Sequence, residues 1–416
     1  MPFNPKSFNS FTLIELLIVI AILAILSVIV VVVINPSELL KQARDSQRLS
    51  DLQTINKAIS LLLVDQPGVF LGQTNTIYTS LIDPNSTSCS SLNLPPLPSG
   101  YQYYCSTSTQ NAQKIDGTGW LPLSFSSISY GSPISKLPID PINNTSTGEY
   151  YTYFPGGSYK LTASLTSLKH IKQSKNDGGI DPVLFEIGSN LQIPNLGRGL
   201  VGYWTFDEGS GTIAYDYSGY GNHGMIGGVG TYTQWAQGKI NNAIQYLSTM
   251  SPGCDPQIAG FEKNSDFSFN LLNLPQSDFT VTLWLKLTSL VHIFHFTTQY
   301  GVSSCGGGGI GGCNRIFSSN GDVSMNINSL NLADNNWKFY TYVFKKSQLK
   351  QFNYVNGNLI NSSNIPNGDY GQIQKVSLGI YYWGCIDASW GFFDDFRIYN
   401  RALSDSEIKA IYEATR

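Results

Sequence analysis

The most constraining feature of the sequence is a long apolar run close to its N-terminus. Residues 11–34 read FTLIELLIVIAILAILSVIVVVVI, and the polar side chains in this run are Thr12, Glu15 and Ser27. As an α-helix rising about 1.5 Å per residue, such a run is long enough to cross the roughly 30 Å hydrocarbon core of a bilayer. The sequence therefore predicts a membrane-spanning helix near the start of the chain.

The residues around this run do not fit an ordinary secretory signal. Residues 1–10 form a polar leader with Lys6 as its one charge, the apolar run exceeds the length of a signal core, and no small-residue cleavage site follows it. A plain membrane anchor would leave Glu15 unexplained, because an ionisable residue inside a spanning helix is costly. We therefore expect Glu15 to have a function.

The string SFTLIEL, which starts at Ser10 and is followed by the apolar run, resembles the class III signal of type IV prepilins and type II secretion pseudopilins. The resemblance implies that a prepilin peptidase cuts between Ser10 and Phe11 and methylates the new amino terminus. It also implies an assembly role for Glu15, which would pair with the N-terminal amine of a neighbouring subunit. A carboxylate in an apolar helix bundle is tolerable only when it is paired. Ser10 departs from the family pattern, which usually has glycine before the cut.

Residues 11–64 are expected to form a transmembrane and assembly helix. Pro36 removes a helical hydrogen bond, so a kink or break is expected near 35–36. Beyond it, apolar residues recur at helical spacing through 37–64 and predict an amphipathic helix packed on a globular head. These apolar residues are Leu39, Leu40, Ala43, Leu52, Ile55, Ile59 and Leu62, and the charged side chains are expected on the opposite face.

Residues 65–190 are rich in Pro, Ser, Thr, Asn and Tyr, with short strand-like runs between turn signals. They predict a small β-rich head and, by position, resemble the variable globular part of bacterial pilins. Cys89 and Cys105 lie in this region, and a structural disulfide between them is expected in an oxidising exterior. Residues 191–199 show no periodic pattern and predict a linker.

Residues 200–416 contain strand-like runs separated by turn signals at intervals typical of an all-β sandwich. Alternation along the first run places Trp204 and Phe206 on one apolar face, where we expect core packing. Runs such as DFTVTLWLKLTS and GFFDDFRIYNRAL resemble the concanavalin A-like, laminin-G-type jelly roll. The predicted fold class is therefore α+β, with a long N-terminal pilin helix, a small β-rich head and an all-β concanavalin A-like sandwich.

Asp394 raises the question of a metal ion. Strand alternation places it on the same face as Phe396 and Ile398, so its carboxylate should point inward and need a metal ion or hydrogen-bond donors. The resemblance implies a structural Ca²⁺ at this end of the sandwich, with oxygen ligands from Asp207, Asp216 and Asp394. Hydrogen bonding to nearby turn amides explains a buried carboxylate equally well.

Four cysteines in this second half predict two disulfides. Cys305 and Cys313 flank a glycine-rich loop, which favours a bridge between them and leaves Cys254 to pair with Cys385. Four cysteines allow three pairings, so the connectivity stays open.

No residue pattern in the sequence supports catalysis. Related jelly rolls that hydrolyse glycosides carry two carboxylates in an ExDxE pattern on one strand, about 5 to 9 Å apart. The nearest clusters here, Asp207–Glu208 and Asp394–Asp395, are adjacent pairs that should point to opposite strand faces. The net charge of −3, with no cluster of basic residues, gives no indication of nucleic-acid binding. We expect a protein that is not an enzyme.

Together these features predict a structural subunit of a type IV pilus-like filament that displays the sandwich for adhesion or glycan binding. Its expected partners are other pilin subunits, prepilin peptidase, the inner membrane, the pilus assembly machinery, and glycans or cell surfaces. Aromatic residues at loop tips, Tyr217, Tyr220 and Trp390, are candidates for stacking on sugar rings. The expected location is the bacterial membrane before assembly and an extracellular filament afterwards.

Two alternatives stay open. The first is a pseudopilin of a secretion or DNA-uptake system, which would use the same processing of residues 1–10. The second is a membrane-anchored monomeric surface lectin or carbohydrate-processing protein, in which residues 11–34 serve only as an anchor. Cleavage before Phe11 and a requirement for Glu15 separate the second alternative from the filament subunit.

Overall fold

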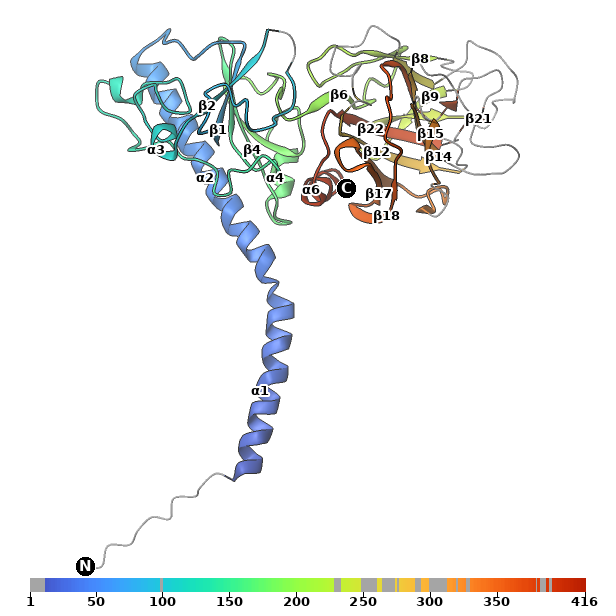
Figure 1. Cartoon of the computed structure of the whole chain (residues 1–416). Helices are drawn as coiled ribbons and strands as arrows, with labels where there is room; N and C mark the ends of the chain where they lie inside the picture. The colour runs from blue at the N-terminus through green and yellow to red at the C-terminus, as the bar shows by residue number, and fades with distance from the viewer. Residues whose placement is uncertain are drawn as a thin grey trace, which may run out of the picture.

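A computed structural model shows a helical stalk, a head and a β-sandwich beside the head (Figure 1). The described residues are 12–97, 100–227, 233–247, 260–263, 274, 277–288, 293–298, 313–318, 321–326, 330–378, 380–381, 387–388 and 391–416. Side-chain surroundings are described for fewer of these residues, and in α1 (Leu13–Ile34) only as far as Leu23. Among the residues described, no helix is both long and apolar enough to cross a bilayer.

The stalk consists of α1 followed by α2 (Pro36–Asp65), which changes direction slightly (Figure 1). The break lies at Asn35, whose backbone adopts the left-handed conformation with φ 45° and ψ 74°. The Asn35 side chain accepts a hydrogen bond from the Glu38 amide at 3.4 Å and so caps α2. Pro36 takes the first position of α2, where its missing N–H is not needed. The break predicted at 35–36 is therefore present.

The fully buried apolar residues of α2 begin at Leu52. The apolar residues from Leu52 to Leu62 that were expected in the core are fully buried. Leu39 and Leu40 are instead 49% and 59% exposed, because the first turns of α2 lie below the head (Figure 1). The expectation that the charged side chains of α2 lie on the face opposite the head is wrong for Asp45 and Arg48, which are fully buried. Their burial has an electrostatic explanation, described below.

The head is built on a five-stranded sheet in the order β2-β1-β3-β4-β5. Its strands are β1 (Thr76–Ile82), β2 (Gln102–Ser106), β3 (Thr152–Pro155), β4 (Tyr159–Ser164) and β5 (Leu184–Gly188). The pair β1–β2 is parallel and the other pairs are antiparallel. Short helices α3 (Thr109–Ala112), η1 (Phe125–Ser127) and α4 (Ile171–Lys175) lie around the sheet. The core between α2 and the sheet includes Trp120, Tyr151 and Leu161.

Two sheets form the sandwich within the described part of the chain. The larger sheet has the order β18-β17-β16-β12-β22-β10-β9, with β6 also pairing with β22, and the smaller has the order β15-β14-β13-β19-β11-β8-β7. The larger sheet contains β6 (Leu200–Trp204), β9 (Thr233–Gln237), β10 (Asn242–Tyr246), β12 (Phe279–Leu287), β16 (Lys338–Lys345), β17 (Lys350–Val355), β18 (Asn358–Asn364) and β22 (Gly391–Tyr399). The smaller contains β7 (Ile213–Ala214), β8 (Gly224–Gly227), β11 (Gly260–Lys263), β13 (Phe294–Thr298), β14 (Cys313–Ser318), β15 (Gly321–Asn326) and β19 (Ile373–Leu378). A separate pair is formed by β20 (Ile380–Tyr381) and β21 (Asp387–Ala388), and η4 (Lys346–Gln348) precedes β17.

The sandwich has one core between its sheets and a second beneath a C-terminal helix. Trp204 and Phe206 are fully buried in the core between the sheets, as the alternation predicted. Trp284 lies on the other face of the larger sheet, in a cluster with Ile408 of α6 (Asp405–Thr415). Because α6 covers this outer face, the central strands β12, β16 and β22 are buried on both faces and do not alternate between buried and solvated positions.

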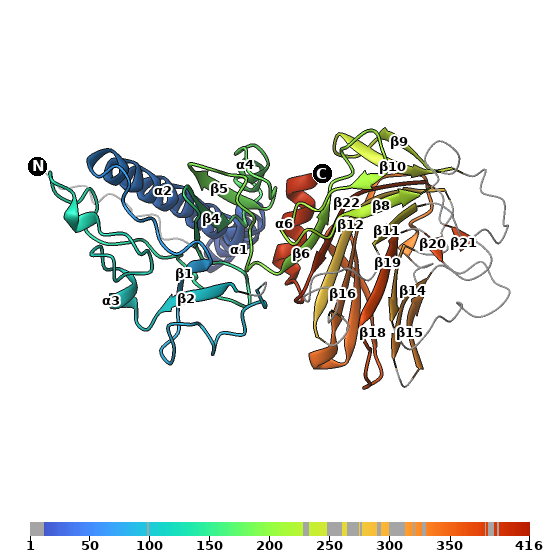
Figure 2. The same ribbon diagram turned by 90° about the horizontal axis from the view of Figure 1, so that it is seen from above.

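The segment between head and sandwich is packed against both. Asn195, Leu196 and Arg198 are only 4%, 6% and 4% exposed, so the predicted linker is docked over much of its length. Figure 2 shows α6 between the sandwich and the part of the head that contains β5 and α4. Helix α4 contacts α6 directly. The chain thus crosses from head to sandwich once and touches the head again with its last helix.

Candidate assembly and binding sites

The N-terminal end of α1 forms the first candidate site. Thr12 is the N-cap of α1, and its hydroxyl accepts a hydrogen bond from the Glu15 amide at 3.3 Å. Glu15 Oε2 accepts in return from the Thr12 amide and hydroxyl, both at 2.8 Å, which completes a capping box. The predicted cleavage residues Ser10 and Phe11 lie outside the described residues. Glu15, four residues after the predicted mature terminus in the sequence, is therefore held by the first turn of α1.

Glu15 and the apolar residues beside it are exposed in the single chain. Leu13 and Ile14 are 78% and 65% exposed, and the described residues of α1 make no core contact with the head. An apolar helix of this kind is stable only when lipid or other helices cover it. The carboxylate of Glu15 keeps one oxygen, Oε1, to which no described residue donates a hydrogen bond.

A buried ion cluster fixes α2 to the head. Arg48 Nε donates to Asp140 Oδ2 at 2.7 Å, its Nη1 to Asp45 at 2.9 Å and its Nη2 to Glu149 at 2.9 Å. Burial disfavours the charged guanidinium, but the hydrogen bond and charge of Asp140, helped by Glu149, raise the pKa of Arg48 above its usual value. Sequence reasoning missed this cluster, because a helical Asp and Arg three residues apart look like an ordinary surface pair.

Arg198 and Arg401 form the joint between head and sandwich. Arg198 donates to the carbonyl oxygens of Gly148 and Tyr150 at 2.7 and 2.6 Å, and its guanidinium lies 4.0 Å from the centre of the Tyr150 ring. Arg401 Nε donates to the Arg198 carbonyl oxygen at 2.9 Å, and its two terminal nitrogens bind Glu407 at 3.0 and 2.6 Å. Planar, bidentate pairs of this kind fix orientation as well as distance.

The joint also restricts which residues fit around it. Gly148 has φ +71°, and a Cβ at this position would lie 2.3 Å from Glu407 Oε1. Glu407 meanwhile caps α6 by accepting hydrogen bonds from the Ser404 amide and hydroxyl, both at 2.9 Å. One carboxylate therefore orients α6, Arg401 and the neighbouring turn of the head.

Asp394 does not lie where strand alternation placed it. It is paired with Trp284 across β22 and β12, next to a register shift, and Asp395 has φ 53°. This bulge displaces the alternation by one residue, so Phe393 and Phe396 enter the core between the sheets while Asp394 shares the outer face with Trp284. The prediction that Asp394 points into the sandwich interior is therefore wrong.

The Asp394 carboxylate binds a neighbouring turn on the outer face. Its Oδ2 accepts from the Lys239 and Ile240 amides at 2.8 and 2.9 Å, and its buried Oδ1 has no partner among the described residues. Burial, followed by the charge of Asp395, raises the pKa of Asp394 to about 8. Asp395 itself pairs with buried Arg397 at 2.9 Å.

The other two predicted calcium ligands also bind turn amides. Asp216 accepts from the amides of Tyr203, Ser218 and Asn222 and from the Ser218 hydroxyl, at 2.8 to 2.9 Å. Asp207 accepts from the Asn242 amide at 3.0 Å, and its charge acts on Asp394, so these two carboxylates lie near one turn. Asp216 stabilises a different turn, which contains Ser218 and Asn222.

The three carboxylates do not form a metal-binding group. In the described part of the chain, no set of three or more His, Cys, Asp or Glu side chains could hold a metal ion. Asp394 Oδ1 is the one atom of the set that still lacks a described donor. Calcium binding therefore stays a prediction of the family resemblance.

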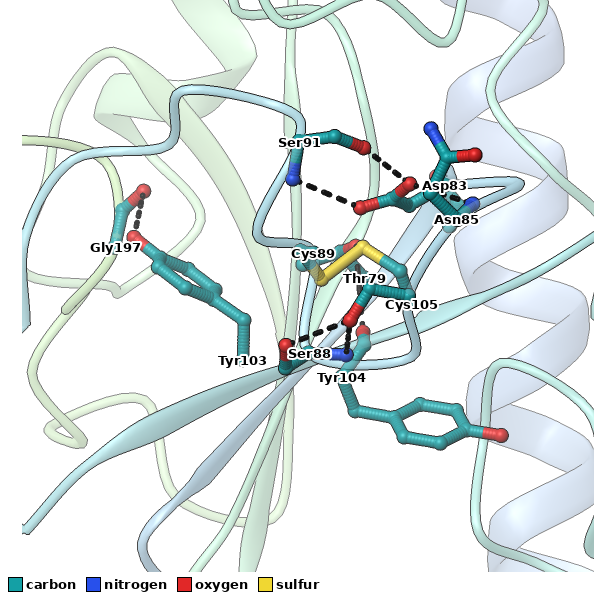
Figure 3. The surroundings of a disulfide bond; sticks show 12 residues. Thr79, Asp83, Asn85, Ser88, Cys89, Ser91, Tyr103, Tyr104, Cys105 and Gly197 are labelled. Carbon is teal, nitrogen blue, oxygen red and sulfur yellow. Dashed lines mark hydrogen bonds between the residues drawn. A yellow bond between two sulfur atoms is a disulfide. The ribbon is translucent and has the colours of Figure 1, made fainter.

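Cys89 and Cys105 form the disulfide that the sequence predicted, across 16 residues (Figure 3). The bridge ties the loop after β1 to β2, and the Cys105 amide donates to the Thr87 carbonyl oxygen of the same loop at 2.9 Å. Cys254, Cys305 and Cys385 lie outside the described residues, and so does the side chain of Cys313. Their predicted pairings stay open.

The loop-tip aromatics fall into different settings. Tyr217 is 42% exposed and contacts the edge of the Tyr203 ring. Tyr220 is half-buried against the core beside the linker. Trp390 lies outside the described residues. Of the predicted stacking residues that the structure describes, Tyr217 is the more exposed.

Comparisons with known proteins agree with both ends of this description. Residues 5–31 match the family described as "Prokaryotic N-terminal methylation motif". Residues 261–409 match the family described as "Concanavalin A-like lectin/glucanases superfamily", of the laminin G type. No curated protein matches the chain. The chain therefore carries a class III prepilin motif at its N-terminus and a concanavalin A-like, laminin-G-type domain at its C-terminus.

Solved structures similar to this chain include binding domains of toxins. The binding domain of Paraclostridial Mosquitocidal Protein 1 is 16% identical, with 51% of this chain and 52% of that chain covered and a TM-score of 0.39. The binding domain of Botulinum Neurotoxin DC in complex with SialylT is 13% identical, with 52% of each chain covered and a TM-score of 0.37. The present chain thus spans about half the length of these structures.

These findings define the class of the protein. It is a prepilin-like protein with a lectin-like domain. A class III signal implies a precursor that is inserted in the membrane and processed for the surface or for secretion, and hence a peptidase and an assembly machinery as partners.

Proposed function

We propose that this chain is a structural subunit of a type IV pilus-like surface filament and that its sandwich serves adhesion or glycan binding rather than catalysis. The observation that carries the proposal is the N-terminal site. Glu15 lies at the start of an exposed apolar helix, in a chain that carries the class III motif. A carboxylate in this position gains most from an amine supplied by another copy of the same helix.

The position of the sandwich supports display. The sandwich lies beside the head, at the end of the stalk remote from the N-terminus (Figure 1). If the α1 helices bundle at the centre of a filament, the sandwich is carried toward the outside. The joint made by Arg198, Arg401 and Glu407 holds it in one orientation, which suits a binding module that must face away from the filament axis.

The filament subunit and the pseudopilin share processing and assembly, whereas the anchored monomer requires neither. The first experiment is therefore mass spectrometry and N-terminal sequencing of the protein from sheared surface material. A methylated start at Phe11 in a high-molecular-weight fraction supports the filament. An uncut Met1, or protein found only as a membrane-bound monomer, overturns it.

The second experiment replaces Glu15. Glu15→Gln removes the charge but keeps the size and leaves a capping side chain, so we expect processing to continue and filament yield to fall at least tenfold. Glu38→Gln is the matched control, because Glu38 also lies in the first turn of its helix. Equal filament yields from the two variants would contradict the proposed role of Glu15.

A glycan-binding assay tests the proposed role of the sandwich. Fluorescently labelled full-length protein is applied to a glycan array, with Tyr217→Ala as the variant that removes the exposed loop aromatic. Specific binding that weakens in this variant supports a lectin-like role. Hydrolysis of any bound glycan would instead establish an enzyme.

A further inference from the structure

The head contains a cavity that belongs neither to the N-terminal site nor to the sandwich. Its volume is about 320 Å³, which falls at the lower end of the range for small-molecule sites. Its walls come from the parallel strands β1 and β2, the loop 87–88, the turn before β1 and the segment 117–122. No described residue of the sandwich lines it.

One wall is fixed by the register of β1 and β2. Thr76 pairs with Gln102 and Tyr78 with Tyr104, so these four side chains share one face of the sheet. Gln102 Nε2 donates to Thr76 Oγ1 at 3.1 Å, and the rings of Tyr78 and Tyr104 lie 5.4 Å apart. The wall therefore presents an amide beside an aromatic ring, both held by cross-strand contacts.

The disulfide shapes a second wall. Figure 3 shows Tyr103 and Tyr104 leaving β2 in opposite directions, with the Cys89–Cys105 bridge next to them. The bridge and the hydrogen bond from the Cys105 amide to the Thr87 carbonyl oxygen hold the 87–88 loop against β2. This loop adds the exposed hydroxyls of Thr87 and Ser88 to the cavity.

The chemistry of these walls selects a neutral ligand. The lining carries amide groups from Gln73 and Gln102, hydroxyls from Thr87 and Ser88, and the Tyr104 ring, but no charged side chain. An ion would gain nothing here to offset its desolvation. A ligand with many hydroxyls and one apolar face matches both the polar groups and the ring, because C–H faces pack on aromatic rings while hydroxyls exchange hydrogen bonds with amides.

We propose that this cavity binds a neutral hexopyranose, free or at the end of a glycan. In this assignment Tyr104 stacks on the apolar face of the sugar, and Gln102 and Gln73 bind its hydroxyls. The subunit then has two binding modules, one in the head and one in the sandwich, and only the head site depends on the disulfide.

The test uses the full-length protein in a detergent that has no sugar headgroup. Methyl glycosides of glucose, galactose and mannose are titrated while binding is followed by saturation-transfer NMR. The variants are Tyr104→Ala and Gln102→Ala; the latter is exposed and outside the core, so it leaves the fold intact. Tyr130→Ala is the matched control, because Tyr130 is 96% exposed and is not among the residues that line the cavity.

We expect saturable binding of at least one glycoside, a loss of roughly tenfold or more in affinity in both variants, and no change in Tyr130→Ala. Glucuronate should not compete with the bound glycoside. Absence of saturable binding overturns the proposal. Binding that is unchanged in both variants also overturns it, since the sugar is then held elsewhere, in the sandwich. Neither outcome bears on filament assembly, which depends on Glu15.

Discussion

Arg401 donates a hydrogen bond from Nε to the carbonyl oxygen of Arg198 over 2.9 Å, which links the end of the sandwich to the segment that leaves the head. The two guanidinium groups bind different parts of the structure. Arg198 donates to carbonyl oxygens of the head, and Arg401 donates to Glu407 of α6. Head and sandwich are thus joined by contacts that are directional as well as buried.

Truncation of Arg401 should lower the free energy of unfolding of the protein. Arg401→Ala removes the bidentate pair with Glu407, whose two side chains are 24% and 15% exposed. We expect a loss of about 1 to 2 kcal/mol in the free energy of unfolding after discounting for partial solvation, measured by urea denaturation. Lys409→Ala is the control, since its pair with Glu413 is longer, at 3.4 Å, and Lys409 itself is 40% exposed. Equal losses of unfolding free energy in the two variants would contradict the prediction that the Arg401–Glu407 pair stabilises the contact between head and sandwich.

Substitution of Arg48 should lower the free energy of unfolding far more than substitution of an exposed basic residue of α2. Arg48→Met leaves Asp45 and Asp140 buried without their cation, and the expected loss is about 3 to 5 kcal/mol. Chemical denaturation of the full chain measures this loss. Lys57→Met on the exposed face of the same helix should cost less than about 0.5 kcal/mol. A similar result for both variants would mean that the buried cluster adds nothing to stability.

Stability should fall as the pH rises from about 4 to 8, because of Asp394. Its pKa is raised to about 8 in the folded protein, whereas the unfolded chain releases this proton near the ordinary value of 3.8. The folded state therefore binds more protons across this window, and each unit of pH costs at most about 1.4 kcal/mol. Asp394→Asn should flatten the dependence, as measured by urea unfolding at pH 5 and pH 8.

Asp177 provides the matched control for this experiment. Burial raises its pKa to about 7, so it should add a slope of the same sign in the head. Asp177→Asn should remove that second contribution and leave the one from Asp394. A wild-type stability that is flat or rises across the window would refute the assignment of both groups.

Calcium binding is testable through the same carboxylate. If the predicted ion binds, added Ca²⁺ raises the melting temperature, since a ligand that binds only the folded state stabilises it. Asp394→Asn should abolish the rise, because Asp394 Oδ1 is the oxygen that lacks a described donor. A melting temperature that is the same in Ca²⁺ and in EDTA would rule the site out.

Patterns that repeat along the chain were readable from the sequence. The break near Pro36, the buried residues of α2 after Leu52 and the core positions of Trp204 and Phe206 follow from local geometry and periodicity. The class III motif was readable for a different reason, since its polar and apolar residues occur in a fixed order.

Features that depend on distant partners were not readable. Arg48 is buried because Asp140 and Glu149, far away in the sequence, meet it in the folded head. The bulge at Asp395 shifts the alternation of β22 by one residue, and no local signal announced it. Residues 191–199 were predicted only as a linker because they lack periodicity, and the hydrogen bonds by which Arg198 docks this segment on the head leave no sequence pattern.

The return of α6 to the head has a mechanical consequence. A force applied to the sandwich is transmitted to the head through two connections. One is the covalent segment that contains Arg198, and the other is the noncovalent contact between α6 and α4. Two attachment points resist torque, whereas one would act as a swivel. The sandwich therefore cannot rotate independently of the head. A force on its outer surface is expected to bend the stalk at Asn35, where the helical hydrogen bonds between α1 and α2 are interrupted.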